Sequence, residues 1–391
     1  MKLNRLHMVG CVLASLALVA SAQTAKPAKP AATTSTDAGN FQLSLVTPVQ
    51  IQNSGRAING LRINLIYGQN TDVTGLDIGV INHATGNLSG SEIGVINIVE
   101  GKATADQLGI INGVGEDLSG VQVAPVGVNY VGGACAGWQL TAAGIDVIMG
   151  KMDGGQANVF GVNYAGAEGE NQLSAAGVNW VAEKQSGAQL VAAGLNYAGS
   201  DADLQAAAAG VNLSLANISA AQFAALGANI ASESADNQIN AAGINYAGDA
   251  ASGLQLSGAG INWAGGKTDA QLVGIGLNTA LDNVSGAQYN LVGINYANND
   301  VSGSEYLLGA GLNIAGGKVD GSQVVLPWLG INYANEINGT QWSAINVASK
   351  VKGFQCGAIN YCDELDGLQI GVINIAVQNK LPVMVVVNAS W

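Results

Sequence analysis

Few residues of this sequence have the types and spacing that catalysis requires. After the first 22 residues the chain contains one histidine, His83, which directly follows a repeated asparagine, and we interpret it as a turn residue rather than a general base. Histidine-based triads and histidine-rich metal sites therefore have no ligands or partners here. Segment 260–268 nearly forms a phosphate-binding loop, but its glycine-to-lysine spacing is one residue too long, so we interpret Gly265, Gly266 and Lys267 as a tight turn.

Acidic and thiol side chains give equally little support for a metal or covalent site. Carboxylates recur between the repeats described below, at Asp201, Asp203, Asp249 and Asp269. The glycine-aspartate nonapeptide of calcium-binding β-rolls is missing, so we interpret these acids as solvated turn charges. Three cysteines follow the leader, Cys135, Cys356 and Cys362, without metal-type spacing; buried thiols are the favoured interpretation, and pairing of Cys356 with Cys362 stays open. We predict no catalytic residue, no metal and no cofactor.

Composition and charge narrow the class of protein. Of 391 residues, 55 are glycine, 48% are hydrophobic and only 10% are charged, whereas about 25% is usual for a globular domain. Lys and Arg total 14 against 27 Asp and Glu, for a net charge of −13. Such an acidic chain is a poor partner for nucleic acid, and with Arg56 and Arg62 as the only arginines after the leader, it lacks the usual receptor for anions.

The amino terminus reads as a processing signal followed by a linker. Lys2 and Arg5 precede the hydrophobic run 8–19 and the small residues 20–22, which predicts a signal peptide over residues 1–22 and export of the chain. Residues 23–40 are polar, with alanines and two prolines, and are expected to form a disordered tether. No later segment reaches the roughly 18 uninterrupted apolar residues of a membrane helix.

The rest of the chain is one repeated unit, marked by asparagines at intervals of 14 to 19 residues from Asn82 to Asn388, with Asp146 replacing asparagine once. The most regular asparagines are Asn163, Asn179, Asn196, Asn212, Asn229, Asn245, Asn262, Asn278 and Asn295. A glutamine precedes most of them by seven residues, at Gln172, Gln189, Gln205, Gln222, Gln238, Gln255, Gln271 and Gln288. A shorter edition of the unit, as in 367–374, places the glutamine five residues before the asparagine.

The unit has the pattern of a β-strand. In the short edition Leu368, Ile370 and Val372 alternate with Gln369 and Gly371, a period of two. We predict a parallel β-solenoid of about 19 short coils, whose aliphatic residues point inward and whose asparagines and glutamines stack as hydrogen-bonded ladders. Residues 41–75 are expected to form an N-terminal β cap, 76–376 the repeats, and 377–391 a C-terminal β cap or closing strand.

An up-and-down outer-membrane β-barrel is the alternative fold. It is supported by the terminal Trp391 after alternating valines and by frequent aromatic residues that could form membrane girdles. Against it, the long unit places glutamine and asparagine on opposite faces of an unbroken strand, so that the lipid-facing side of nearly every strand would carry an amide. We therefore favour the solenoid.

An aromatic residue often follows the repeated asparagine and forms the strongest candidate binding row: Tyr164, Trp180, Tyr197, Tyr246, Trp263, Tyr296 and Tyr333. A flat aromatic row could bind a glycan, a membrane interface or another protein chain. The alternative is an aromatic stack that only seals the coil. These residues, and not a catalytic group, are the candidate functional site.

Segments 41–45, 60–68 and 75–82 near the start, and 367–374 with Leu381 and Pro382 near the end, resemble a bacterial (leptospiral-type) surface repeat-containing protein family. The resemblance covers both ends of the repeat region; the long units in the middle depart from it. It implies location at a bacterial surface and no established activity.

Together these observations predict an exported protein at the cell surface or outer membrane, or secreted, with a structural or adhesive role and no catalysis. Candidate partners are the cell envelope, a glycan or another protein chain, including a second copy. The alternative function is an outer-membrane barrel acting as channel or anchor.

Overall fold

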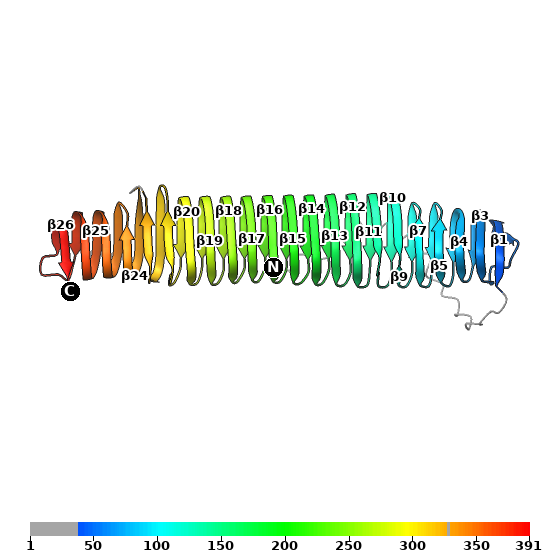
Figure 1. Ribbon diagram of the computed structural model, residues 1–391, viewed down its shortest axis with the longest axis horizontal. Coiled ribbons are helices and arrows are strands. Elements are labelled where there is room, and N and C mark those ends of the chain that lie inside the picture. The colour runs from blue at the N-terminus through cyan, green and yellow to red at the C-terminus, as the bar shows by residue number, and fades with distance from the viewer. Residues whose placement is uncertain (1–37, 327–328) are drawn as a thin grey trace, which may run out of the picture. The chain divides into compact units, whose positions relative to one another are not determined.

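The computed structural model describes residues 38–326 and 329–391. The predicted signal peptide, residues 1–22, and most of the predicted tether lie outside the described residues. From Gly39 onward the described chain is all β, and its coils stack side by side along one axis (Figure 1). The prediction of a parallel β-solenoid of about 19 coils is confirmed.

The strands before the regular centre vary in length from two to 13 residues. They are β1 (Gly39–Val46), β2 (Val49–Gln50), β3 (Ile58–Asn70), β4 (Val73–Ala84), β5 (Leu88–Ile93), β6 (Ile96–Val99), β7 (Ala103–Leu108), β8 (Ile111–Val114), β9 (Leu118–Ser119) and β10 (Val121–Val131). The central strands are β11 (Trp138–Ile148), β12 (Met152–Ala165), β13 (Gly169–Val181), β14 (Gln185–Ala198), β15 (Ala202–Ser214), β16 (Ile218–Ala231), β17 (Ala235–Ala247), β18 (Ala251–Ala264), β19 (Thr268–Ala280) and β20 (Val284–Ala297). The last strands are β21 (Ser304–Leu307), β22 (Gly311–Val319), β23 (Ser322–Val325), β24 (Gly330–Trp342), β25 (Ile345–Ala376) and β26 (Val383–Ser390).

Neighbouring coils pair in parallel and in register. Between β13 and β14, Gln172 lies opposite Gln189 and Asn179 opposite Asn196. Glutamine faces glutamine from β10 to β20, and asparagine faces asparagine except at Asp146, as the repeat requires. The barrel alternative is wrong, because a barrel of that kind needs antiparallel neighbours. At about 4.8 Å per coil, the stack is roughly 90 Å long.

The direction in which the side chains point is the main correction to the sequence-based prediction. Gln369 is fully buried, whereas Ile370 is 38% and Val372 68% exposed. The prediction is therefore wrong for the aliphatic residues that flank the amides, which point outward. The aliphatic residues that do fill part of the interior lie on either side of the turn that starts each coil, such as Ile148, Met152 and Val181. Burying an amide costs little when each of its polar atoms is hydrogen-bonded, and most of the stacked amides meet that condition, as shown below.

A glycine corner explains how Gln and Asn, seven residues apart, both point inward. In β14, Gly194 has φ +147°, and a Cβ there would lie 1.9 Å from the carbonyl oxygen of Gly177 in the preceding coil. Only glycine tolerates this conformation and this approach. The corner interrupts the alternation, so that Gln189 and Asn196 are both fully buried.

Both ends of the stack carry a strand that departs from the parallel pattern. At the start, β2 pairs antiparallel with β1, and β1 in turn pairs parallel with β3. At the other end, β26 pairs antiparallel with the last part of β25, with Asn388 opposite Gln369. These strands cover edges that would otherwise present unpaired backbone groups.

Candidate functional site

A ladder of glutamine amides runs through the interior. Gln205 donates from Nε2 to Oε1 of Gln189, at 2.7 Å, and also to the backbone carbonyl of Leu213, at 3.1 Å. Because a carbonyl can only accept, the second bond fixes the orientation of the amide. The predicted glutamines Gln172, Gln189, Gln205, Gln222, Gln238, Gln255, Gln271 and Gln288 all lie in this ladder and are at most 1% exposed.

A second ladder, of asparagines, runs in the opposite direction. Asn196 donates from Nδ2 to Oδ1 of Asn212 in the next coil, at 2.8 Å, and to the backbone carbonyl of Ala206, also at 2.8 Å. The fully buried members include Asn163, Asn179, Asn196, Asn212, Asn229, Asn245, Asn262, Asn278 and Asn295. The glutamine amides donate toward the N-terminal coils and the asparagine amides toward the C-terminal coils, so the dipoles of the two ladders oppose each other.

Two carboxyl groups replace amides within the ladders. Glu305 is fully buried in the glutamine ladder, and burial raises its pKa to about 8, although Gln323 donates to its Oε2 at 2.6 Å. Oε1 of Glu305 and Oε1 of Gln288 both lack a donor, and a proton on Glu305 would join them. In the asparagine ladder, Asp146 accepts from Asn129 at 2.8 Å and from Thr141 at 3.0 Å, while burial raises its pKa to about 7.

Charged residues form three early rungs of the glutamine ladder, directly after Gln42, a feature that we did not foresee. Arg62, Asp77 and Glu92 are fully buried at successive positions that continue to Gln107. Arg62 bonds Asp77, and Gln107 donates to Glu92 at 2.7 Å. Burial, and then the charge of Asp77, raise the pKa of Glu92 well above its usual value. Their spacing of 15 residues was the available signal in the sequence.

The predicted aromatic row lies on one broad face of the coil stack, one residue after the asparagine ladder. Tyr246 is 37% and Tyr333 43% exposed, and Tyr164, Trp180, Tyr197, Trp263 and Tyr296 are half-buried. Trp180 and Tyr197 stack with ring centroids 3.8 Å apart and planes at 23°. Aliphatic or hydroxyl residues interrupt the column at Leu213, Ile230 and Thr279. The row is therefore a discontinuous aromatic surface.

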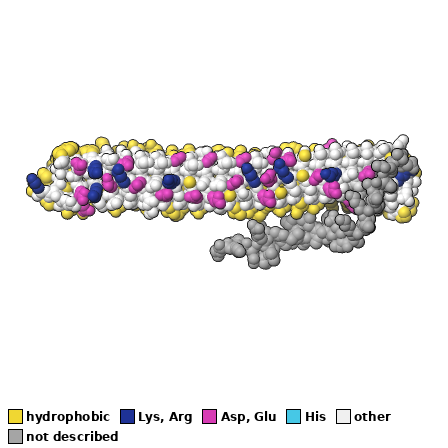
Figure 2. Space-filling view, turned by 90° about the horizontal axis from the view of Figure 1, so that it is seen from below, with side chains coloured by type: hydrophobic (Ala, Val, Ile, Leu, Met, Phe, Trp, Pro, Cys, Tyr) yellow, Lys and Arg dark blue, Asp and Glu magenta, His cyan; other side chains and the backbone are white. Residues whose placement is uncertain are grey.

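Exposed charges gather along one edge of the stack, which we call the charged edge. Each new coil starts with a turn, and the residue after that turn belongs to a column that includes Met152, Ala202, Ala251 and Thr268. The charged edge consists of this residue, the two residues before it and the one residue after it. Between residues 121 and 376 every charged side chain except buried Asp146 and Glu305 lies there. Figure 2 shows these acidic and basic side chains as a stripe, with hydrophobic side chains along its two borders.

Serine hydroxyls donate hydrogen bonds to some of the carboxylates of the charged edge. Ser219 donates to Asp203 at 2.6 Å, and Ser252 to Asp236 at 2.7 Å, each from the following coil. The predicted turn acids Asp201, Asp203, Asp249 and Asp269 all belong to this edge, but Asp203 and Asp269 are the second residues of β15 and β19, so the prediction of a turn is wrong for these two. In the described part of the chain no three His, Cys, Asp or Glu residues come together as metal ligands.

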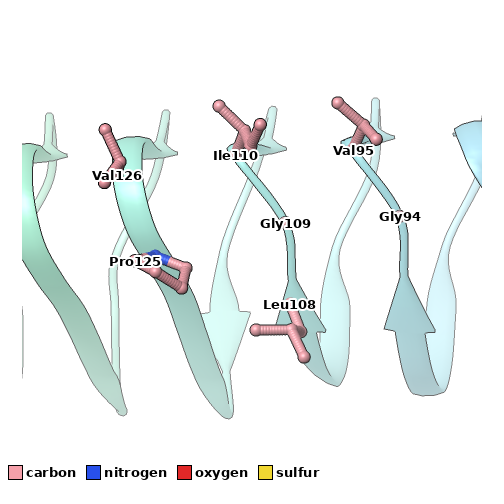
Figure 3. Close-up of a pocket in the computed structure, with 7 residues that line it drawn as sticks. All are labelled: Gly94, Val95, Leu108, Gly109, Ile110, Pro125 and Val126. Atoms are coloured by element: carbon pink, nitrogen blue, oxygen red, sulfur yellow. The ribbon is translucent and has the colours of Figure 1, made fainter.

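The opposite turn, between glutamine and asparagine, is apolar, and we call it the apolar edge. In the long coils it consists of the pairs 125–126, 142–143, 159–160, 175–176, 192–193, 208–209, 225–226, 241–242, 258–259, 274–275 and 291–292. Every one of these residues is Gly, Ala, Val, Leu, Ile, Phe or Pro. The short coils continue the edge at 79–80, 94–95 and 109–110. A shallow hollow, lined by Val95, Leu108, Ile110, Pro125 and Val126, marks the step from short to long coils (Figure 3).

His83 lies in strand β4, not in a turn, so that part of the prediction is wrong. Its Nδ1 is 2.9 Å from the hydroxyl of Tyr67 and its Nε2 3.0 Å from Glu100, which links neighbouring coils. Burial lowers the pKa of His83, and hydrogen bonding to Glu100 opposes that effect. The residues that resemble a phosphate loop lie at opposite edges of the coil. Gly260 is the corner glycine next to the apolar edge, and Gly265, Gly266 and Lys267 form the turn of the charged edge.

The three cysteines among the described residues are free thiols. Cys135 and Cys362 are buried and Cys356 is half-buried. Burial, followed by the nearby charge of Asp363, raises the pKa of Cys362 to about 12, so this thiol stays protonated. None of the described residues forms a helix long and apolar enough to cross a membrane.

Comparison with protein-family models, curated proteins and solved structures gave no match for this chain.

Proposed function

We propose that the chain is an exported bacterial surface protein with a structural or adhesive role and no catalysis, related to the leptospiral-type surface repeat proteins. The single observation that carries the structural role is the pair of amide ladders, which extend through most of the stack. Each coil contacts only its neighbours, and the ladder bonds repeat from coil to coil except at the buried charged residues such as Asp146 and Glu305. Such a molecule holds its two ends a fixed distance apart, as a spacer or a display scaffold must.

The surface favours binding by area over catalysis in a cleft. Enzyme sites usually gather several convergent polar groups in a concave pocket. Here the polar groups that converge are the ladder amides, which are already bonded to one another. The hollow at the apolar edge is lined by apolar side chains and glycine. The aromatic row and the apolar edge are the surfaces that an adhesive role would use.

Export and surface display are tested by fractionation of cells that express the full chain. We expect mature protein outside the cytoplasm, starting at Gln23, and its degradation when intact cells are treated with protease. The matched variant replaces Lys2, Arg5 and the apolar run 8–19 with polar residues and should stay in the cytoplasm. Wild-type protein retained in the cytoplasm with its N-terminus intact would overturn the proposal.

A further inference from the structure

The apolar edge is larger and more uniform than solubility alone would allow. Phe160 is 61%, Leu226 60% and Ile275 63% exposed, all at the same position of their coils. Over the roughly 65 Å of stacked coils from 79–80 to 291–292, and at a width of about 10 Å, this edge presents on the order of 650 Å². The largest apolar patch on a typical soluble monomer is about 300 to 600 Å², and larger ones mark interaction sites.

On the broad face that carries the aromatic row, polarity changes in a fixed order from this edge. In β18 and the turn after it, Ala259 lies on the apolar edge, Ile261 and Trp263 follow on the broad face, and Lys267 lies on the charged edge. Other coils repeat the order, for example Ala193, Leu195, Tyr197 and Asp201. Aliphatic, aromatic and charged layers in that order match the hydrocarbon, headgroup and water layers of a lipid bilayer, where Tyr and Trp prefer the headgroup level.

The shape of the edge favours a fluid partner over a rigid one. Bulk along one column varies irregularly from alanine to phenylalanine, as at Phe160, Ala176, Ala193, Ala209 and Leu226. A second copy of the chain would have to fit these large side chains in one register, and two convex edges would leave gaps at the alanines. Acyl chains can fill such gaps at any register.

We propose that the apolar edge binds lengthwise to a lipid bilayer surface, with the aromatic row at headgroup level and the charged edge in water. The mostly acidic charged edge then faces away from the membrane, so anionic lipid is not required for binding. This inference goes beyond the proposed structural or adhesive role and does not depend on it. The apolar edge has the same polarity whether or not the chain is displayed on a cell.

Flotation with vesicles of pure phosphatidylcholine tests the proposal. The chain used begins at Gln23, which retains every residue of the described fold and omits the apolar run 8–19. We expect it to float with the vesicles, with little change between low and high salt. The variant Phe160→Asp/Leu226→Asp/Ile275→Asp should bind at least tenfold more weakly, because it places three charges in the apolar layer.

Two further variants keep the result interpretable. Ser186→Asp/Ser252→Asp/Ser302→Asp adds the same charge to the charged edge, at a turn position where other coils carry Asp, and should bind like the wild type. Phe160→Ala/Leu226→Ala/Ile275→Ala introduces the residue that neighbouring coils already have, so it should fold, and it should bind detectably more weakly than the wild type.

Failure of the wild type to float, or equal flotation of the wild type and both edge variants, would overturn the proposal. Light scattering of the chain without vesicles tests the competing partner, which is a second copy of the chain. A wild-type dimer that the edge variants convert to monomer, without flotation of either, would assign the edge to a second copy and also overturn the lipid proposal.

Discussion

The short coils near the two ends and the long coils in the centre both place glutamine and asparagine in the interior, but they use different turns to do so. Between Gln369 and Asn374 a short coil has four residues, and between Gln255 and Asn262 a long coil has six. In the long coil Ser257 points inward and is fully buried, widening the interior. In the short coil Gly371 takes the turn, where a Cβ would lie 2.1 Å from the carbonyl oxygen of Gly357.

What does not change between the two regions is the pair of ladders. Gln107 donates to Glu92 and Asn97 to Asn112 in the short coils, with the same polarity as in the centre. The inward residue added in the long coils often supports the asparagine ladder, as when Ser174 donates to Asn179 at 2.7 Å. The amide ladders define the coil, and the turn at the apolar edge can vary in length around them.

The largest loss of stability is expected from a substitution of the corner glycine, which only the long coils have two residues before the asparagine. Gly194→Ala forces a side chain into positive φ and against the carbonyl oxygen of Gly177, so coils must separate, and we expect a loss of more than about 4 kcal/mol in the free energy of unfolding. Urea denaturation followed by circular dichroism measures it. Gly113→Ala is the control, because its Cβ would have no atom closer than 3.9 Å, and a loss of similar size there would refute the corner argument.

Removing one rung should cost nearly the same in either region, if the ladder is common to both. Gln222→Leu in a long coil and Gln355→Leu in a short coil each leave a buried donor and a buried acceptor without partners. We expect losses of about 2 to 5 kcal/mol. The exposed Gln378→Leu should be close to neutral in the same denaturation experiment. A large loss in the centre with none near the end would show that the ladder is not shared.

Glu305, whose carboxyl group replaces an amide of the glutamine ladder, should make the free energy of unfolding depend on pH. The folded-state pKa of Glu305 is about 8, above its unfolded value of about 4.5, so the native state keeps a proton that the unfolded state loses. Its contribution to stability therefore falls as pH rises from about 4.5 to 8, by up to about 1.4 kcal/mol per pH unit. Glu305→Gln should match the wild type at pH 4 and exceed it at pH 8. A stability difference independent of pH would contradict the buried, protonated rung.

The smallest effect should come from the charged edge. Lys102 and Asp117 form a salt bridge of 2.8 Å between neighbouring short coils, and both side chains are about half exposed. Exposed pairs contribute at most about 1 kcal/mol, and commonly much less. Lys102→Ala should shift the urea midpoint little, and a shift comparable to that of Gln355→Leu would mean that the edges, not the ladders, hold the coils together.

The sequence was sufficient for the repeat, the strands and the parallel stack, because identical residues at constant spacing can meet only when coils are in register. The residues that became buried were not predictable from hydropathy. Ile370 and Val372 look like core residues and Gln369 like a surface residue, yet Gln369 is buried and the two aliphatic side chains are exposed, because neighbouring coils supply partners for the buried amide. The interior charges Arg62, Asp77 and Glu92 were missed for the same reason.

The apolar edge also escaped prediction from the sequence. Its alanines and valines are ordinary residues one by one, and they form a surface only after stacking places Val126, Phe160 and Leu226 in one column. The aromatic row was visible in the sequence because an aromatic residue so often follows the marker asparagine. Its place between an apolar and a charged edge required the coil geometry.

Hydrogen exchange of the side-chain amides, followed by NMR with ¹⁵N label in Gln and Asn, tests the central claim most directly. The buried ladders predict that the side-chain NH₂ groups of residues such as Gln205 and Asn196 are protected for hours, as slowly exchanging as the backbone of β14 to β16. Side-chain amides that all exchange at the rate of free glutamine, in a folded protein with a protected backbone, would contradict it.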